Sequence, residues 1–202
     1  MKLKLFGYDI TISYYFGAMV PIALLLDATG AALWGMFAAA VHELGHLWMM
    51  HLLKCPKCQI RITVFGIQMV QEEYGGYGFR RDCLISIAGP FINLFFFAVF
   101  SALGNALPES NLQNAPALSQ LAIGLFNLLP VYPLDGGQVL YSFFCAKFSL
   151  CTADWTIRVI SFFFLLPVAY LGFLTLFQSR YNFSILLIVG YLVFLLMLKE
   201  RY

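Results

Sequence analysis

The chain has 202 residues, of which 61% are hydrophobic and only 11% are charged, and its mean hydropathy is +0.82. A soluble domain of this length could not bury that much apolar surface, so the composition predicts a polytopic membrane protein and excludes an ordinary soluble enzyme. The formal net charge of +2 is too small to indicate a nucleic-acid partner.

Six apolar segments are long enough to cross a membrane, since a helix needs about 20 residues to span about 30 Å of hydrocarbon. In chain order the predicted spans cover residues 10–26, 31–53, 83–103, 117–141, 157–177 and 183–198. The first follows two lysines, as in a signal peptide, but no small-x-small cleavage site precedes the next apolar run. The predicted fold class is an all-α polytopic membrane protein with six transmembrane helices, forming a single domain over residues 1–202.

The positive charges of the chain are distributed unevenly about these spans. If the amino terminus lies in the cytosol, eleven of the twelve lysines and arginines fall on the inside and only Arg180 falls outside. Because cytosolic loops are enriched in lysine and arginine, both termini are predicted to be cytosolic.

One connection is long, at residues 54–82, and it contains QIRITVFGIQMVQ at residues 59–71. Apolar and polar residues alternate in this stretch, with Ile62 and Val64 on one face, and Gly66 allows a turn. Alternation is typical of strands. The stretch therefore predicts a small β-hairpin associated with the membrane surface.

A C-x-x-C pair, Cys55 and Cys58, precedes that hairpin. The pair is either an ordinary cytosolic loop or half of a zinc knuckle. No second pair follows at a suitable spacing, which favours the loop.

The second predicted span contains HELGH at residues 42–46. In a helix, residues i and i+4 share a face, so His42 and His46 can bind one cation. Glu43 lies about 100° away around the helix, where a carboxylate can act on a water beside the metal. This arrangement is typical of zinc hydrolases, and ionisable groups are costly inside a membrane. The alternative is a cluster of hydrogen bonds that only packs helices.

The fourth predicted span contains NLLPVYPLDGG at residues 127–137. Pro130, Pro133 and the paired glycines predict a broken membrane helix, which is tolerated where the freed backbone lines a cavity. Asp135 on this broken segment is a candidate third metal ligand. Its alternative role is to cap a half-helix.

The depth of these residues in the membrane supports one shared site. His42 and His46 lie 12 and 8 residues before Lys54, and Asp135 lies 12 residues before Lys147. At ~1.5 Å per residue, all three lie roughly 12–18 Å from the cytosolic boundary. Both spans run from outside to inside, so the three groups can meet at one level.

The motifs HELGH at 42–46, GPFIN at 89–93 and NLLPVYPLDG at 127–136 resemble the three signatures of the site-2 protease family of intramembrane zinc metalloproteases. The resemblance covers a three-helix core at about residues 31–145. The chain resembles a compact form of the family, with no PDZ domain between spans and no CBS domain.

The resemblance implies one Zn²⁺ per chain, bound by His42, His46 and Asp135. It implies Glu43 as the catalytic base, and it implies that Asn93 and Asn127 line the substrate cleft, although both could instead be interhelical hydrogen-bonding residues. A strand of the hairpin is also a candidate for pairing with an extended substrate. The residues predicted to bind substrate are Asn93, Asn127, Pro130, Pro133, Ile62 and Val64.

The predicted function is zinc-dependent hydrolysis of a peptide bond in or near a transmembrane segment of a membrane protein or peptide, as in regulated intramembrane proteolysis. The expected location is a bacterial cell membrane, with the site open toward the cytosol. The lipid bilayer is the expected environment, no nucleic acid is expected, and a homo-oligomer is left open. The alternative function is a zinc transporter, or a zinc-binding membrane protein without protease activity.

Overall fold

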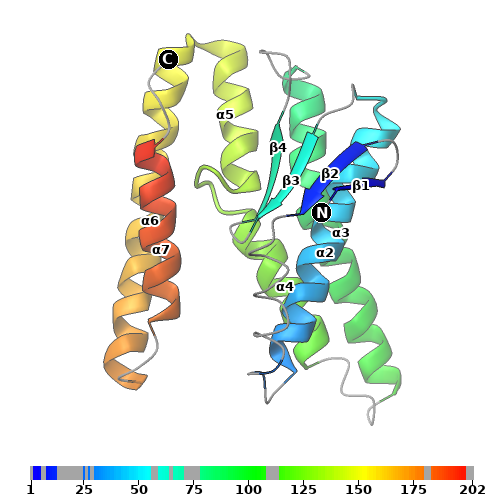
Figure 1. Ribbon diagram of the computed structural model, residues 1–202. Coiled ribbons are helices and arrows are strands. Elements are labelled where there is room, and N and C mark those ends of the chain that lie inside the picture. The colour runs from blue at the N-terminus through cyan, green and yellow to red at the C-terminus, as the bar shows by residue number, and fades with distance from the viewer. Residues whose placement is uncertain are drawn as a thin grey trace. The chain divides into compact units, whose positions relative to one another are not determined.

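The computed structural model describes residues 2–5, 8–12, 25, 27, 30–55, 59–63, 66–70, 78–107, 114–179 and 183–198. The chain forms two compact units, whose elements are labelled in Figure 1. The first unit comprises Met1–Tyr77 and Ala88–Gly124, and the second comprises Gly78–Ile87 and Leu125–Tyr202.

The first unit contains a four-stranded sheet in the order β1-β2-β3-β4. β1 and β2 are antiparallel, β2 and β3 are parallel, and β3 and β4 are antiparallel. Both central strands therefore have a neighbour on each side, and β1 and β4 are the edges. The strands are β1 (Lys2–Leu5), β2 (Tyr8–Ile12), β3 (Gln59–Thr63) and β4 (Gly66–Val70).

The start of the first predicted span is corrected by this sheet. Residues 10–12, which were expected to be helical, belong to β2, where Ile10 and Ile12 alternate with Asp9 and Thr11. That alternation has the period of a strand rather than that of a helix. Residues 13–24 of the predicted span lie outside the described residues.

The long helix of the first unit is α2 (Ala31–Leu52). Gly30 precedes it in a left-handed conformation with φ of 73°, and the Ala32 N–H donates to Asp27 Oδ2 at 2.7 Å, which satisfies one of the free amides at the helix start. One face of α2 is buried and carries both histidines. The opposite face carries a row of exposed apolar side chains, namely Leu33, Phe37, Leu44, Trp48 and Leu52.

The other helices of this unit come close together at glycines. α3 (Phe79–Ala106) enters the first unit at Ala88, and α4 (Ala115–Asn127) belongs to it as far as Gly124. A Cβ atom at Gly45 of α2 would lie 2.8 Å from Ala88 O of α3, and one at Gly124 would lie 3.2 Å from Asn93 Cβ. The α3 backbone therefore has close neighbours on both α2 and α4.

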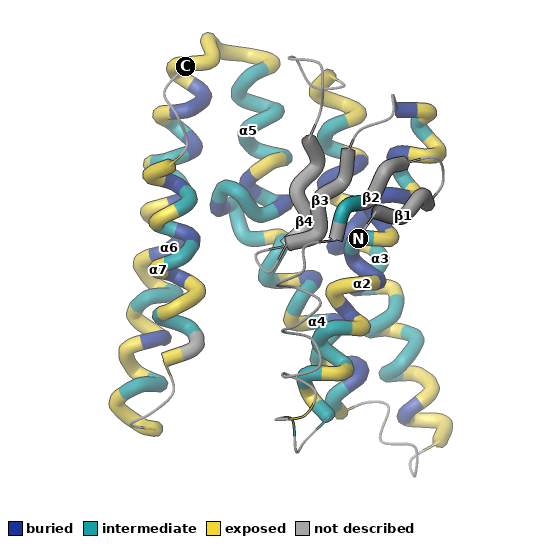
Figure 2. Tube along the Cα trace, viewed as in Figure 1, coloured by how far each residue is buried: buried dark blue, intermediate teal, exposed yellow. Residues whose placement is uncertain are grey.

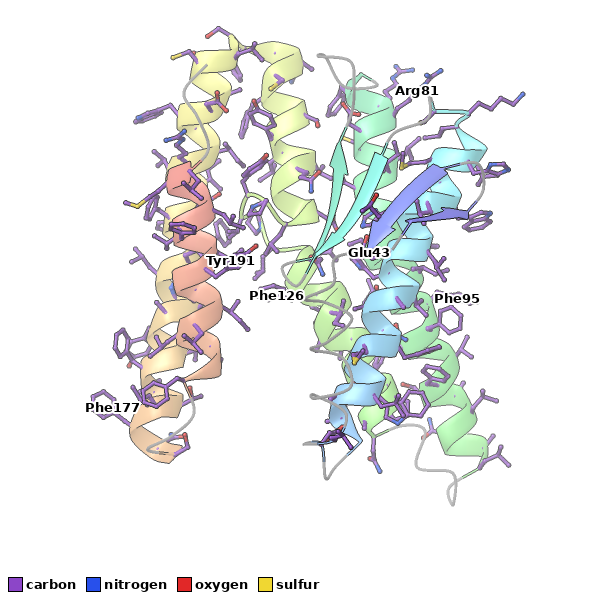
Figure 3. The ribbon with its side chains drawn as sticks, in the orientation of Figure 1. Glu43, Arg81, Phe95, Phe126, Phe177 and Tyr191 are labelled. Carbon is purple, nitrogen blue, oxygen red and sulfur yellow. The ribbon has the colours of Figure 1, made fainter. Side chains whose placement is uncertain are left out.

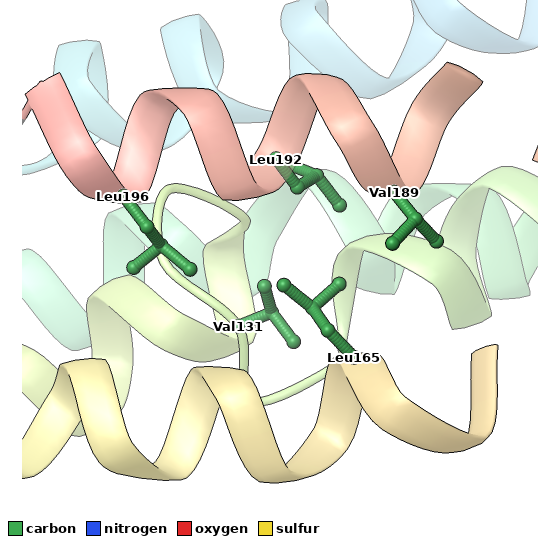
Figure 4. Packing of buried hydrophobic residues seen from close by; sticks show 5 residues of the cluster. All are labelled: Val131, Leu165, Val189, Leu192 and Leu196. Carbon is green, nitrogen blue, oxygen red and sulfur yellow. The ribbon is translucent and has the colours of Figure 1, made fainter. Parts of the chain in front are cut away.

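The second unit consists mainly of α5 (Asp135–Lys147), α6 (Leu150–Ser179) and α7 (Ser184–Leu198). Its apolar core joins α6 and α7 to the loop before α5, as Figure 4 shows. The loop is also fixed by a hydrogen bond, because the Tyr132 N–H donates to Ser161 Oγ at 2.9 Å. The core residues are Val131, Leu165, Val189, Leu192 and Leu196.

Among the described residues, α3 and α6 are long and apolar enough to cross a membrane by length and composition, and α7 is apolar but shorter. Only 33% and 17% of the most apolar stretches of α3 and α6 are buried, whereas the core helix of a soluble protein would be mostly buried. Figure 2 shows exposed residues along the whole of α6. The predicted fourth span is divided between α4 and α5, as its prolines and glycines indicated.

We predict that Gly45→Val destabilises the protein, because its side chain would collide with the α3 backbone. Overpacking of this kind costs about 1–3 kcal/mol, and thermal unfolding in detergent, followed by circular dichroism, measures it. Gly35→Ala in the same helix is the matched control, since a Cβ there has no atom within 4 Å. Equal melting temperatures for the two variants would contradict the close approach of α2 and α3.

Candidate metal centre

His42 and His46 lie one turn apart on the buried face of α2, and each is 4% exposed. Their Nε2 atoms are 3.1 Å apart and their rings are nearly perpendicular, at 83°. Two nitrogens bound to one zinc ion at about 2.0–2.1 Å in tetrahedral geometry would be about 3.3 Å apart. The pair therefore has the spacing that a shared metal ion needs.

Asn93 of α3 determines which nitrogen of His42 is available. Its Nδ2 donates to Ala38 O at 3.0 Å, and because a carbonyl oxygen can only accept, the orientation of the amide is fixed. Asn93 Oδ1 then lies 2.8 Å from His42 Nδ1 and accepts a hydrogen bond from it. In the neutral ring, Nδ1 carries the proton and Nε2 keeps the lone pair that a metal would bind.

Gly89 of α3 leaves open the space in front of the two imidazoles. A Cβ atom at this position would collide with His46 Nε2 and lie 2.8 Å from His42 Cε1. The glycine of GPFIN is thus explained by its contact with the histidines of HELGH. The two motifs, which are distant in sequence, form one structural feature.

Glu43 follows His42 on α2 and is half-buried; it is labelled in Figure 3. It lies about 100° further around the helix than His42. Its carboxylate is thus neither on the histidine face of α2 nor fully exposed, which suits a group that exchanges protons with water beside a metal.

Asp135 is the first residue of α5 and is 7% exposed. Its position depends on the next two residues. A Cβ atom at Gly136 would collide with the backbone of Leu128, and one at Gly137 would collide with the backbone of Val131. The DGG sequence therefore lets the loop fold back against the start of α5. A carboxylate in the first turn of a helix is stabilised by the helix dipole.

The other predicted site residues have different environments. Asn127 ends α4 and is half-buried, as are Pro130 and Pro133 in the loop that follows. Ile62 lies in β3, which is paired on both sides, so its backbone is not at a sheet edge. Val64 lies outside the described residues.

Asn93 is more deeply buried than the other residues predicted to bind substrate that the structure describes with their burial. It was expected to line the substrate cleft, but its side chain is 0% exposed, and both its amide nitrogen and its oxygen are hydrogen-bonded within the protein. One of these hydrogen bonds orients the His42 ring. The open alternative, an interhelical hydrogen-bonding residue, describes it better.

Sequence reasoning missed Gln120 of α4, which is 0% exposed and accepts a hydrogen bond from Asn93. A signal was available: among the buried residues of α4, Gln120 alone is polar, and it lies four positions before Gly124 on the same face. A buried amide on an otherwise apolar or small-residue face needs a partner.

Three curated relatives are similar in sequence over 53–62% of this chain. Stage IV sporulation protein FB of Bacillus subtilis is 26% identical over 127 residues, which are 44% of that protein. The putative zinc metalloprotease sll0528 of Synechocystis is 31% identical over 112 residues, or 29% of that protein. Zinc metalloprotease MJ0392 of Methanocaldococcus jannaschii is 26% identical over 116 residues, or 33% of that protein. The chain thus spans less than half the length of these relatives, and no family model matches it.

A solved structure extends the likeness to the whole fold. The site-2 protease from Methanocaldococcus jannaschii superposes with a TM-score of 0.67, over 100% of this chain and 95% of that chain, at 19% identity. The chain therefore has the fold of that protein.

We predict that Gly89→Ala weakens binding of a divalent metal ion, because the added methyl group displaces the rings of His42 and His46. A fall in affinity of about 10–100-fold is expected by analogy with the loss of groups that orient metal ligands. Competition with a chelator, with Zn²⁺ as the probe, measures it in detergent solution. Gly35→Ala is again the control, and unchanged affinity in Gly89→Ala would contradict the arrangement of the two rings.

Proposed function

We propose that the chain belongs to the site-2 protease family and that it is an integral membrane zinc endopeptidase. Its reaction is hydrolysis of a peptide bond in or near a transmembrane segment of a membrane protein. Its fold, shared with a site-2 protease, and the zinc metalloproteases among its relatives support this function.

The single observation that carries the proposal is the grouping of His42, His46 and Asp135. All three side chains are buried, and their ligand atoms lie within 4.8 Å of one another. Two imidazole nitrogens and one carboxylate oxygen form a donor set that suits zinc and leaves a fourth position for water or substrate. The proposed stoichiometry is one Zn²⁺ per chain, with these three residues as ligands.

In this proposal the metal, Glu43 and Asn93 have separate roles in the reaction. When bound, zinc would act as a Lewis acid that polarises the scissile carbonyl group and makes a nearby water more acidic. The Glu43 carboxylate accepts the proton of the attacking water and later delivers it to the leaving amine. Asn93 does not contact the substrate; it keeps His42 in the tautomer that can bind a metal.

The substrate is proposed to lie along the broken segment between α4 and α5. Asn127, Pro130 and Pro133 are half-buried there, so part of each side chain is accessible, and backbone freed from helical hydrogen bonds can line a polar cavity. The β4 strand is the candidate for pairing with an unwound substrate, because it is a sheet edge, whereas β3 is not.

For the membrane arrangement we keep the one that the distribution of lysine and arginine predicts. We propose six spans with both termini in the cytosol of a bacterium, and with the site and the sheet near the cytosolic face. The exposed apolar rows on α2 and α6 suit contact with lipid. We propose neither a particular oligomeric state nor a nucleic-acid partner.

We predict that Glu43→Gln abolishes cleavage of a model transmembrane substrate while the protein keeps one zinc per chain. Loss of the base should lower the rate by about 10²–10⁴-fold, as measured in detergent or liposomes. His46→Ala and Asp135→Ala should lose both zinc and cleavage, with zinc content measured by plasma emission spectroscopy.

Two outcomes would reject parts of this proposal. Stoichiometric zinc in Asp135→Ala would remove Asp135 from the ligand set. Zinc flux into liposomes that survives Glu43→Gln, with no cleavage by the wild-type protein, would favour a transporter.

We predict that Met69→Pro impairs cleavage of a membrane substrate but not zinc binding. A two-residue connection between Thr63 and Gly66 is typical of a hairpin in which the flanking pair exchanges hydrogen bonds. By alternation, the Met69 N–H then points away from β3, where a substrate strand would pair with it. Met69→Ala keeps that N–H and is the control. Equal activities of the two variants would remove β4 as a substrate-binding edge.

A further inference from the structure

Gln120 lies on the buried face of α4. It is 0% exposed, and Gly124 lies one turn further along the same face, where a Cβ atom would be 3.2 Å from Asn93 Cβ. The close approach lets the Gln120 side chain reach the Asn93 amide, whose Nδ2 donates to Gln120 Oε1 at 2.6 Å.

The donors and acceptors around Asn93 permit one arrangement only. Its amide nitrogen has two N–H groups, and Ala38 O takes one of them. Gln120 Oε1 takes the other, and a Gln120 amide turned by 180° would place NH₂ against NH₂. Two acceptors, from α2 and α4, therefore hold Asn93 with its oxygen toward His42.

Within the part of the chain that the structure describes, this arrangement leaves one donor of Gln120 unsatisfied, which lowers the stability of the fold. Its Nε2 is buried and has no hydrogen-bond partner among the described residues of the protein. A buried donor without a partner is destabilising, and leucine, of similar size, would not introduce one. The glutamine is thus better explained by what its oxygen does to Asn93 than by packing.

We propose that Gln120 is a positioning residue of the metal centre: by accepting a hydrogen bond from Asn93, it keeps His42 in the Nδ1–H tautomer, with the lone pair on Nε2, the atom that faces His46 Nε2 at 3.1 Å. The use of this lone pair to bind zinc rests on the proposed function. The tautomer itself does not, since it follows from the hydrogen bonds of Asn93.

Nitrogen NMR of histidine tests the proposal directly. The chain has three histidines, and His51 is exposed, so His51→Gln in ¹⁵N-histidine-labelled protein leaves only the two buried rings. The spectra are recorded on metal-free protein in detergent at pH 8, where free imidazole is neutral. One further sample with His46→Gln identifies the His42 signals.

The expected result is the Nδ1–H tautomer of His42 in the reference protein and a mixture of tautomers in Gln120→Leu. In the same variant the dissociation constant for Zn²⁺ should rise about tenfold, the lower end of the effect of losing a group that orients a ligand. Gln120→Glu keeps an acceptor at the same place and should retain the tautomer and an affinity close to that of the wild type.

Three results would overturn the proposal. The first is the Nε2–H tautomer of His42 in the reference protein. The second is an unchanged tautomer in Gln120→Leu. The third is an equal change in Gln120→Leu and Gln120→Glu, which would mean that Gln120 acts only by packing. If the wild type binds no zinc, the proposed function fails, but the tautomer comparison still decides the role of Gln120.

Discussion

The close approach of α2 and α3 is the constraint on which the rest of the site depends. Gly45 allows the α3 backbone to approach α2, and Gly89 allows the histidine rings to occupy the space beside α3. At that separation Asn93 reaches both Ala38 O and His42 Nδ1. A side chain at either glycine would separate the helices or displace the rings, and the hydrogen bonds that orient His42 would be lost with them.

The polar groups of this region form a network of hydrogen bonds in which each donor and acceptor sets the orientation of the next side chain. The Ala38 carbonyl and the Gln120 side-chain oxygen together hold the Asn93 amide, that amide orients the His42 imidazole, and the imidazole keeps its lone pair on Nε2. Such order is valuable for a metal ligand, because the cost of orienting the ring is met when the protein folds and not when the ion binds. In the second unit the backbone at Asp135 is positioned differently, by a loop that packs against two glycines.

The parts of this account that depend on local sequence could be predicted. The i, i+4 spacing of His42 and His46 and the break before Asp135 follow from helix periodicity and from proline and glycine. For Asn93 the sequence left two roles open, because it does not say which side chain of α3 faces α2. Gln120 was missed although it is polar on a helix face of small and apolar residues, because its hydrogen-bond partner Asn93 comes from another helix. The helix expected from residue 10 was wrong at its start, because residues 10–12 form β2 and pair with β3, about fifty residues further along the chain. The short alternation at residues 9–12 was a local sign of a strand, but nothing local indicates so distant a partner.

X-ray absorption at the zinc edge on the purified protein tests the central claim most directly. Two imidazole nitrogens at about 2.0–2.1 Å and carboxylate or water oxygens at about 2.0–2.2 Å, with no sulfur, are the predicted ligands. Sulfur scatterers at about 2.3 Å would contradict the account, because they would move the metal from the buried histidines to cysteines such as Cys55 and Cys58.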